Sequence, residues 1–168
     1  MELLPDCNKL LLRAGVGWKP GSVGNLTEGA NVDSQLGRTL ATGEPLVVTD
    51  LASEDRFKAS WMLLNHDVVS GVTVRISTRD QPFGVLGVHS SRTRTFSGEE
   101  VNFLVTVVTT LASAIERART EAELQRLAAF AQLNPNPAME LTLEGVISYF
   151  NDAALKLALS VNFDHPRG

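Results

Sequence analysis

Residues 96–133 read FSGEEVNFLVTVVTTLASAIERARTEAELQRLAAFAQL and contain no proline. Ser97 and Glu100 are three residues apart, which predicts a capping box: each side chain accepts a hydrogen bond from the backbone N–H of the other residue. Phe96, before this cap, and Val101, after it, are placed to form a hydrophobic staple that fixes the direction of entry. The stretch therefore predicts a single helix that begins at Ser97.

The end of this helix is predicted by Asn134-Pro135-Asn136-Pro137, which follows Leu133. Proline has no backbone N–H and disfavours helical geometry in the residue before it, so the helix is expected to stop here. At about 1.5 Å per residue the helix would reach roughly 55 Å, which exceeds the width of a small domain. We therefore expect it to leave the domain in which it begins.

Along this helix, apolar residues recur at alternating steps of three and four: Val101, Leu104, Val108, Leu111, Ile115, Ala118 and Ala122. This is the spacing of a packed or coiled-coil seam. Up to Ser113 the other faces are apolar as well, whereas from Glu116 onward they carry charges. Two interpretations stay open. The helix is either a solvated surface helix with one core-facing stripe, or it pairs with its twin in a parallel dimer and connects two domains.

Composition narrows the class of protein. The chain has 168 residues, of which 43% are hydrophobic and 20% are charged, enough for one ordinary core and part of another. A formal net charge of −4 argues against a nucleic-acid partner. The single cysteine, Cys7, excludes a disulfide framework and a multi-cysteine metal site and fits a reducing compartment. No apolar run approaches the ~18 residues of a membrane span and no signal peptide is recognisable, so we expect a cytoplasmic chain.

Upstream of the long helix, the pattern predicts an antiparallel sheet with flanking helices, an α+β fold. A turn at Pro5–Asn8 suggests a hairpin between residues 1–4 and 9–16, and the short first strand suggests that the chain begins inside a domain. The glycine-dense residues 15–24 lack the context of a phosphate loop. The remaining expected elements are a helix over Ser34–Thr42 ended by Gly43, strands over 46–49, 71–77 and 83–90, and short helical turns over 50–67.

Four segments resemble the GAF domain, a sensory module of signalling proteins: Gly43–Asp50, Ser70–Ile76, Phe83–Val88 and Arg94–Leu104. Together they cover about residues 9–118 in the order of that family. The resemblance implies a GAF-like antiparallel β-sheet flanked by helices, with a long C-terminal signalling helix. It also implies that the family's N-terminal helix and most of its first strand are missing, which would expose apolar surface at Leu10 and Leu12.

Residues 128–154 resemble the opening of a PAS domain. The sequence predicts a β-hairpin that turns at Glu144-Gly145, then a helix capped by Asn151 or Asp152. Too few residues follow for a complete PAS domain. The expected organisation is therefore a GAF domain over 1–118, a linker or signalling helix over 119–133, and a truncated PAS start over 134–168.

These resemblances imply a sensory or regulatory GAF module of a bacterial signal-transduction protein. It would relay the binding of a small ligand through the long helix to a PAS domain and a downstream output, in the first place a histidine kinase. The alternatives are a ligand-free dimerisation or spacer module and the regulatory domain of a diguanylate cyclase. His66, His89 and His165 lack a phosphoacceptor context and no nucleotide-binding glycine motif follows, so the chain is not expected to be an enzyme. A homodimer through the long helix is expected.

The family's ligand position implies a site between the sheet and the segment 50–70, with Arg75 on the adjoining strand. The candidate ligand-binding residues are Asp50, Phe57, Trp61, Asn65, His66 and Arg75. Trp61 would stack on a ring, Asn65 and His66 would bind polar groups, and Arg75 would pair with an anion. The structural alternatives are that Trp61 belongs to the core, that His66 ends a surface helix, and that Arg75 is an exposed strand residue.

Three ligand classes known in this family fit the sequence poorly. Covalent bilin attachment needs a cysteine that is absent between Asp50 and Ser70. The Asn-Lys-x-x-x-Phe-x-x-x-Asp-Glu motif of cyclic-nucleotide-binding members does not occur. Free methionine sulfoxide reductases resolve their sulfenic acid with further cysteines, and Cys7 is alone. The cofactor or ligand therefore stays unknown, and no metal site is expected.

Overall fold

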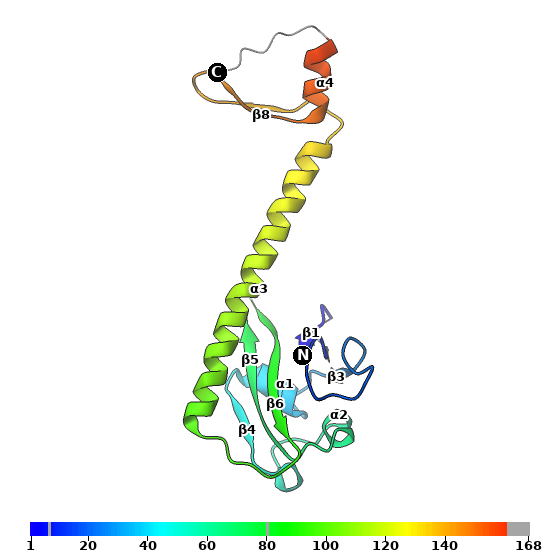
Figure 1. Cartoon of the computed structure of the whole chain (residues 1–168), viewed down its shortest axis with the longest axis vertical. Coiled ribbons are helices and arrows are strands. Elements are labelled where there is room, and N and C mark those ends of the chain that lie inside the picture. The colour runs from blue at the N-terminus through cyan, green and yellow to red at the C-terminus, as the bar shows by residue number, and fades with distance from the viewer. Residues whose placement is uncertain (7, 80, 161–168) are drawn as a thin grey trace. The chain divides into compact units, whose positions relative to one another are not determined.

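A computed structural model describes residues 1–6, 8–79 and 81–160 of the chain (Figure 1). The chain divides into two compact units, the first ending at Glu116 and the second beginning at Arg117. Cys7, on which the expectation of a reducing compartment rested, lies outside the described residues, as does the tail from Val161.

The described part of the first unit contains a six-stranded antiparallel sheet in the order β3-β2-β1-β6-β5-β4. Its strands are β1 (Glu2–Leu3), β2 (Lys9–Leu11), β3 (Thr27–Gly29), β4 (Leu46–Val48), β5 (Ser70–Ser77) and β6 (Pro82–Ser90). Its short helices are α1 (Gln35–Thr42), the 3₁₀ turn η1 (Leu51–Ser53) and α2 (Trp61–Asn65). The long helix α3 (Gly98–Leu133) begins in this unit (Figure 1). The predicted α+β fold class is confirmed.

The ends of both predicted helices follow from their caps. In α1, the Ser34 hydroxyl accepts a hydrogen bond from the backbone N–H of Gly37, and Gly43 ends the helix at a φ of 78°. In α3, Ser97 and Glu100 form the predicted capping box, with N–H to side-chain oxygen distances of 2.9 and 3.2 Å. The helix ends at Leu133, directly before the proline-containing turn. Local capping chemistry therefore predicted both helices.

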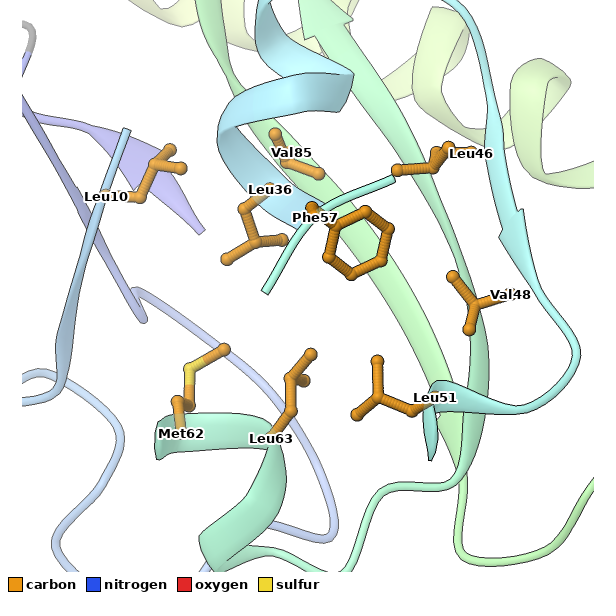
Figure 2. Close-up of a cluster of buried hydrophobic side chains, with 9 residues drawn as sticks. All are labelled: Leu10, Leu36, Leu46, Val48, Leu51, Phe57, Met62, Leu63 and Val85. Carbon is orange, nitrogen blue, oxygen red and sulfur yellow. The ribbon is translucent and has the colours of Figure 1, made fainter. Parts of the chain in front are cut away.

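The sheet of the first unit has a hydrophobic cluster on each face. On one face, side chains from the sheet, α1 and α2 form the cluster drawn in Figure 2: Leu10, Leu36, Leu46, Val48, Leu51, Phe57, Met62, Leu63 and Val85. On the other face, Val72, Val74 and Ile76 of β5 pack against Val108 and Ala112 of α3. Strands β5 and β6 thus lie between the two clusters.

Leu10 and Leu12 are buried, with 0% and 2% of their surface exposed, so the expectation that they would be exposed is wrong. Strand β3, which the sequence reading did not anticipate, pairs with β2 and places Glu28 opposite Leu10. The backbone N–H of Leu12 also donates to the carbonyl of Leu26. The segment after the glycine-dense loop therefore covers this edge of the sheet.

The predicted seam of α3 packs mainly on the chain's own sheet. Val101, Leu104, Val108 and Ile115 all belong to or pack against the cluster around Val72. The other three predicted seam residues, Leu111, Ala118 and Ala122, are exposed. A second apolar row, Phe103, Val107 and Leu111, is exposed as well. The sheet therefore takes most of the predicted seam in this unit and leaves a different apolar face of α3 uncovered.

The apolar composition of α3 also raises the question of whether this helix could span a membrane. By length and composition alone, α3 contains an 18-residue window apolar enough to cross a membrane, and 11% of that window is buried. The expectation that no segment approaches these criteria is therefore wrong. A helix that packs on a sheet meets the same criteria, and α3 packs on the sheet through Val108 and Ala112.

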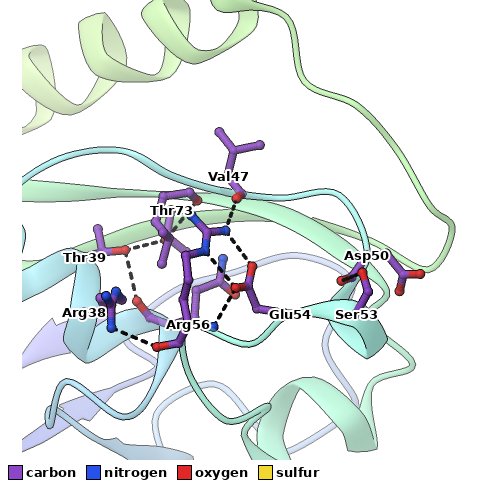
Figure 3. A network of polar contacts seen from close by, with 10 residues as sticks. Arg38, Thr39, Val47, Asp50, Ser53, Glu54, Arg56 and Thr73 are labelled. Atoms are coloured by element: carbon purple, nitrogen blue, oxygen red, sulfur yellow. Dashed lines mark hydrogen bonds and ion pairs between the residues drawn. The ribbon is translucent and has the colours of Figure 1, made fainter.

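A polar network holds the segment after β4 against the edge of the sheet (Figure 3). The Arg56 guanidinium donates to both carboxylate oxygens of Glu54 and to the carbonyl of Val47, 2.8 Å away. Hydrogen bonds from Arg56 lower the pKa of Glu54 to about 2. Further in, the hydroxyls of Thr39 and Thr73 lie 2.6 Å apart and join α1 to β5. The network thus satisfies a carbonyl of the edge strand β4.

The second unit contains the hairpin β7 (Met139–Leu141) and β8 (Ile147–Phe150), followed by α4 (Asp152–Ser160). Asn151, with 0% of its surface exposed, is the predicted cap of α4. Its Oδ1 accepts hydrogen bonds from the backbone N–H groups of Ala138 and Ala154. Its Nδ2 donates to three carbonyls, those of Ala131, Asn134 and Asn136. One amide side chain therefore joins the end of α3, the proline turn and the start of α4.

Candidate functional site

A cavity of about 570 Å³ lies in the first unit between the glycine-dense loop, α2 and the end of β6. The loop contributes residues 14–18, α2 and its C-cap contribute Met62 and His66, and β6 with its following turn contributes residues 86–91. Among the described residues, the lining of this cavity contains no aspartate, glutamate, lysine or arginine. Its volume lies in the range that holds small molecules in proteins.

Trp18 lies close to two imidazole rings in this cavity. Its ring centre is 4.7 Å from that of His66 and 6.1 Å from that of His89, and both contacts are edge-to-face, at 75° and 73°. Such perpendicular contacts are favoured because the positive edge of one ring meets the negative face of the other. The three rings therefore give the cavity an aromatic wall.

His66 is held in a defined orientation. Its Nδ1 lies 2.8 Å from the carbonyl oxygen of Met62, and its Nε2 lies 3.4 Å from the hydroxyl of Ser22. A carbonyl only accepts hydrogen bonds, so Nδ1 must carry the proton. In the neutral ring, Nε2 then accepts from the Ser22 hydroxyl. Both ring nitrogens of His66 are thus used to position the ring.

His89, on β6, is the polar group of the cavity that lacks a partner. Its buried Nδ1 has no hydrogen bond within the described part of the chain. The ring lies over Gly71 and Gly87: a Cβ on Gly71 would come within 2.4 Å of Nδ1, and one on Gly87 within 2.6 Å of Nε2. Burial lowers the pKa of His89 to about 4, so the ring is neutral at pH 7.

The burial of His89 predicts a pH dependence of stability. Because its pKa is about 4 in the folded protein and about 6.5 when unfolded, the unfolded chain binds more protons between these values. The free energy of unfolding should therefore be highest above pH 6.5 and fall toward pH 4, by at most about 3 kcal/mol from this group. Urea unfolding followed by circular dichroism at several pH values measures it, with His89→Gln for comparison.

The comparison with His89→Gln is needed because Glu28 changes the free energy of unfolding with pH in the opposite direction. Burial raises the pKa of Glu28, so its contribution to stability is lost as the pH rises. Both proteins contain Glu28, and its effect cancels in the difference. Equal pH slopes for the wild type and His89→Gln would contradict the assignment of the low pKa to His89.

The six predicted ligand-binding residues do not come together in the structure. Of these, His66 lines the cavity with Trp18 and His89. Asp50 caps η1, Phe57 belongs to the core, and Asn65 accepts a hydrogen bond from Lys19. Trp61 is 70% exposed, so the alternative that it belongs to the core is wrong. The five-residue helix α2 turns Met62 and Leu63 inward instead.

Arg75 lies at a different place, the C-terminal end of α1. Its Nη1 donates to the carbonyl of Leu40 over 3.1 Å, and its Nε donates to the Ser77 hydroxyl over 2.9 Å. A cation that donates to the last carbonyls of a helix stabilises the helix end. Arg75 also borders a second cavity, of about 590 Å³, between β5 and α3. The structure thus gives Arg75 a role in packing.

Sequence reasoning passed over Trp18 and did not place His89 in the site. Trp18 is not among the predicted site residues, although it is the one aromatic residue in a loop otherwise rich in glycine. His89 faces Gly71 across the β5–β6 ladder, and Gly87 lies two residues before it on the same face. This register, with two glycines beside one histidine, was the available signal.

The comparisons with known proteins agree on the fold. The sequence model described as GAF domain matches residues 3–115. The GAF domain from an Acinetobacter phosphoenolpyruvate-protein phosphotransferase is 24% identical, with a TM-score of 0.61 over 73% of this chain and 71% of that one. The corresponding domain from Coxiella burnetii is 23% identical, with a TM-score of 0.63 and 73% of each chain covered.

Residues 122–287 of a methyl-accepting chemotaxis protein are 15% identical, with a TM-score of 0.59 over 69% of this chain and 74% of that chain. A search among curated proteins finds no match. At identities below 25%, the similarity to these solved structures concerns the fold.

Proposed function

Because this chain belongs to the GAF domain family, we propose that it is a regulatory module that senses a small molecule and transmits its binding through α3. GAF domains are regulatory or sensory modules of signalling proteins. The observation that carries the proposal is the cavity walled by the aromatic rings of Trp18, His66 and His89. Proteins bind small molecules in cavities of this kind, where apolar and aromatic walls surround a few polar groups.

The architecture provides a route from this cavity to α3. His89 lies on β6, which pairs with β5 along most of its length. The opposite face of β5 packs against α3 through Val72, Val74 and Ile76. A ligand that changes the position of β6 therefore acts on strands that already contact the helix. A preference of about 1–3 kcal/mol for one arrangement of the helix is sufficient for regulation.

We further propose that the second unit is the start of a PAS domain and that the output of the whole protein is a histidine kinase, with a diguanylate cyclase as the alternative. The hairpin β7–β8 and the helix α4 capped by Asn151 support the first part, since these elements match the expected opening of such a domain. In this arrangement the chain is a regulatory part and performs no catalysis itself.

Mass spectrometry of the purified chain tests the sensory function. Native spectra should show an added non-covalent mass, and denaturing spectra should show the bare chain. Trp18→Leu should weaken binding of this molecule up to about tenfold, because it removes an aromatic contact worth about 0.5–1.5 kcal/mol. Trp61→Leu is the matched control, since Trp61 is 70% exposed and does not line the cavity.

Two results together would contradict the sensory function. The purified chain would carry no added mass, and no compound from a metabolite library would raise its thermal stability. Loss of the added mass in Trp61→Leu and not in Trp18→Leu would place the site elsewhere.

A second candidate function is a dimerisation and spacer module without a ligand. It is favoured by the exposed apolar row Phe103, Val107 and Leu111 on α3, which the chain's own sheet does not cover. A symmetric pair of α3 helices from two copies would bury these residues. The two functions are compatible, because a dimer of α3 helices is also a means to transmit ligand binding.

A further inference from the structure

We propose that the ligand of this cavity is an uncharged, planar ring compound that hydrogen-bonds through its edge to the neutral imidazole of His89. This inference rests on the proposed sensory function and specifies the chemical class that the site accepts. It follows from three features of the cavity: its lack of charge, its aromatic wall and the unused hydrogen-bonding capacity of one histidine.

The lining of the cavity has no side chain to neutralise a charged ligand. Among the described residues it contains no aspartate, glutamate, lysine or arginine. Lys19, next to Trp18, donates to Asn65 at the surface. The α-amino group of Met1 donates to the carbonyl of Val85 over 2.8 Å, and burial lowers its pKa. The side chains of the cavity thus include no carboxylate, ammonium or guanidinium group to pair with a charged ligand, which disfavours such a ligand wherever it is shielded from water.

The wall of the cavity offers both faces and edges of aromatic rings to a ligand. The imidazole of His89 lies over Gly71 and Gly87, whose missing side chains leave no atoms between the ring and the sheet. Trp18 stands at 73° to this ring and at 75° to that of His66. Aromatic ligands pack against such walls by stacking or by edge-to-face contacts. A volume of about 570 Å³ holds a molecule of one or two fused rings with substituents.

The polar contact is expected at His89. A neutral imidazole has one N–H donor and one acceptor nitrogen. In His66 both positions are used, by Met62 and Ser22. In His89 the buried Nδ1 has no hydrogen-bond partner within the described residues and is closed off from solvent. A ligand in the cavity therefore reaches the imidazole through Nε2, which donates or accepts according to the tautomer. A ligand that forms this hydrogen bond gains binding energy relative to one that does not.

Nuclear magnetic resonance of the ¹⁵N-labelled protein tests this inference. The chain contains two tryptophans, so Trp61→Phe leaves the indole N–H signal of Trp18 alone. Two matched pairs serve as probes: indole with indole-3-carboxylate, and adenine with adenosine 5′-monophosphate. We expect the neutral member of at least one pair to shift the Trp18 signal with a Kd at least tenfold lower than that of the charged member. His89→Leu should weaken this binding about tenfold.

The outcomes separate this inference from the sensory function. Tighter binding of the charged members would overturn the proposed ligand class and leave the sensory function intact. The proposed ligand class would also be overturned, with the sensory function intact, if the co-purifying molecule is an anion. The same conclusion follows if a molecule co-purifies but no neutral probe shifts the Trp18 signal. If no probe shifts Trp18 and no mass co-purifies, both proposals are wrong. Equal binding by the wild type and His89→Leu would remove His89 from the site.

Discussion

Gly37→Ala is expected to destabilise the first unit by about 3 kcal/mol, although alanine favours helices by about 1 kcal/mol over glycine. Gly37 lies in α1, and a Cβ there would be 1.9 Å from the carbonyl oxygen of Asn31 and 2.7 Å from the carbonyl carbon of Ala30. These are backbone atoms, so the clash cannot be relieved by rotating a side chain. The Asn31 carbonyl is also fixed, because the hydroxyl and the N–H of Ser34 both donate to it.

The control for this prediction is Gly98→Ala in the first turn of α3. A Cβ on Gly98 meets nothing within 4 Å, so this change should leave stability unaltered or raise it by up to about 1 kcal/mol. Urea unfolding followed by circular dichroism measures both. Similar midpoints for the two variants would show that the chain around Asn31 yields easily, contrary to the close packing seen here.

Replacing Phe103 and Leu111 together by glutamate is expected to convert the proposed α3 dimer into monomers and to raise its dissociation constant at least 100-fold. Phe103 is 67% exposed, and neither residue belongs to the cluster that packs α3 on the sheet. The change should therefore spare the fold of the first unit. In a symmetric dimer it would place four carboxylates in an apolar interface, at a cost of several kcal/mol.

Sedimentation equilibrium over a range of concentrations measures this effect. Asn102→Glu with Thr109→Glu is a matched control, since both side chains are exposed on a different face of the same helix and add the same charge. The proposed interface would be wrong if the wild type is a monomer at high concentration. It would also be wrong if both double variants weaken the dimer equally.

Elements with strong local signals were predictable from the sequence. The capping box of Ser97 and Glu100 and the stop signals at Gly43 and Asn134 depend only on neighbouring residues, and the structure has both helices where these signals place them. Strand β3 was missed because Thr27-Glu28-Gly29 carries no run of strand-forming residues. It forms a strand because β2 offers it a free edge, which is a tertiary effect.

The candidate site was harder to predict from the sequence. It depends on the register between β5 and β6 and on which face of the short helix α2 is buried. Trp61 and His66 are five residues apart, yet one is exposed and the other lines the cavity. A single turn such as α2 shows no periodicity from which its buried face can be read. The contact of His89 with Gly71 and Gly87 requires the exact pairing of β5 and β6. Trp18 reaches the cavity from a loop, for which no periodic rule exists.

The hydrogen bonds of Asn151 connect Ala131, near the end of α3, with Ala154, near the start of α4, through one side chain. Because the same amide holds the end of one helix and the start of the next, neither helix end can fray without releasing the other. The two ends and the turn between them should thus open as one cooperative event. We therefore expect the amide protons in the C-terminal turn of α3 to exchange with solvent about as slowly as those at the start of α4.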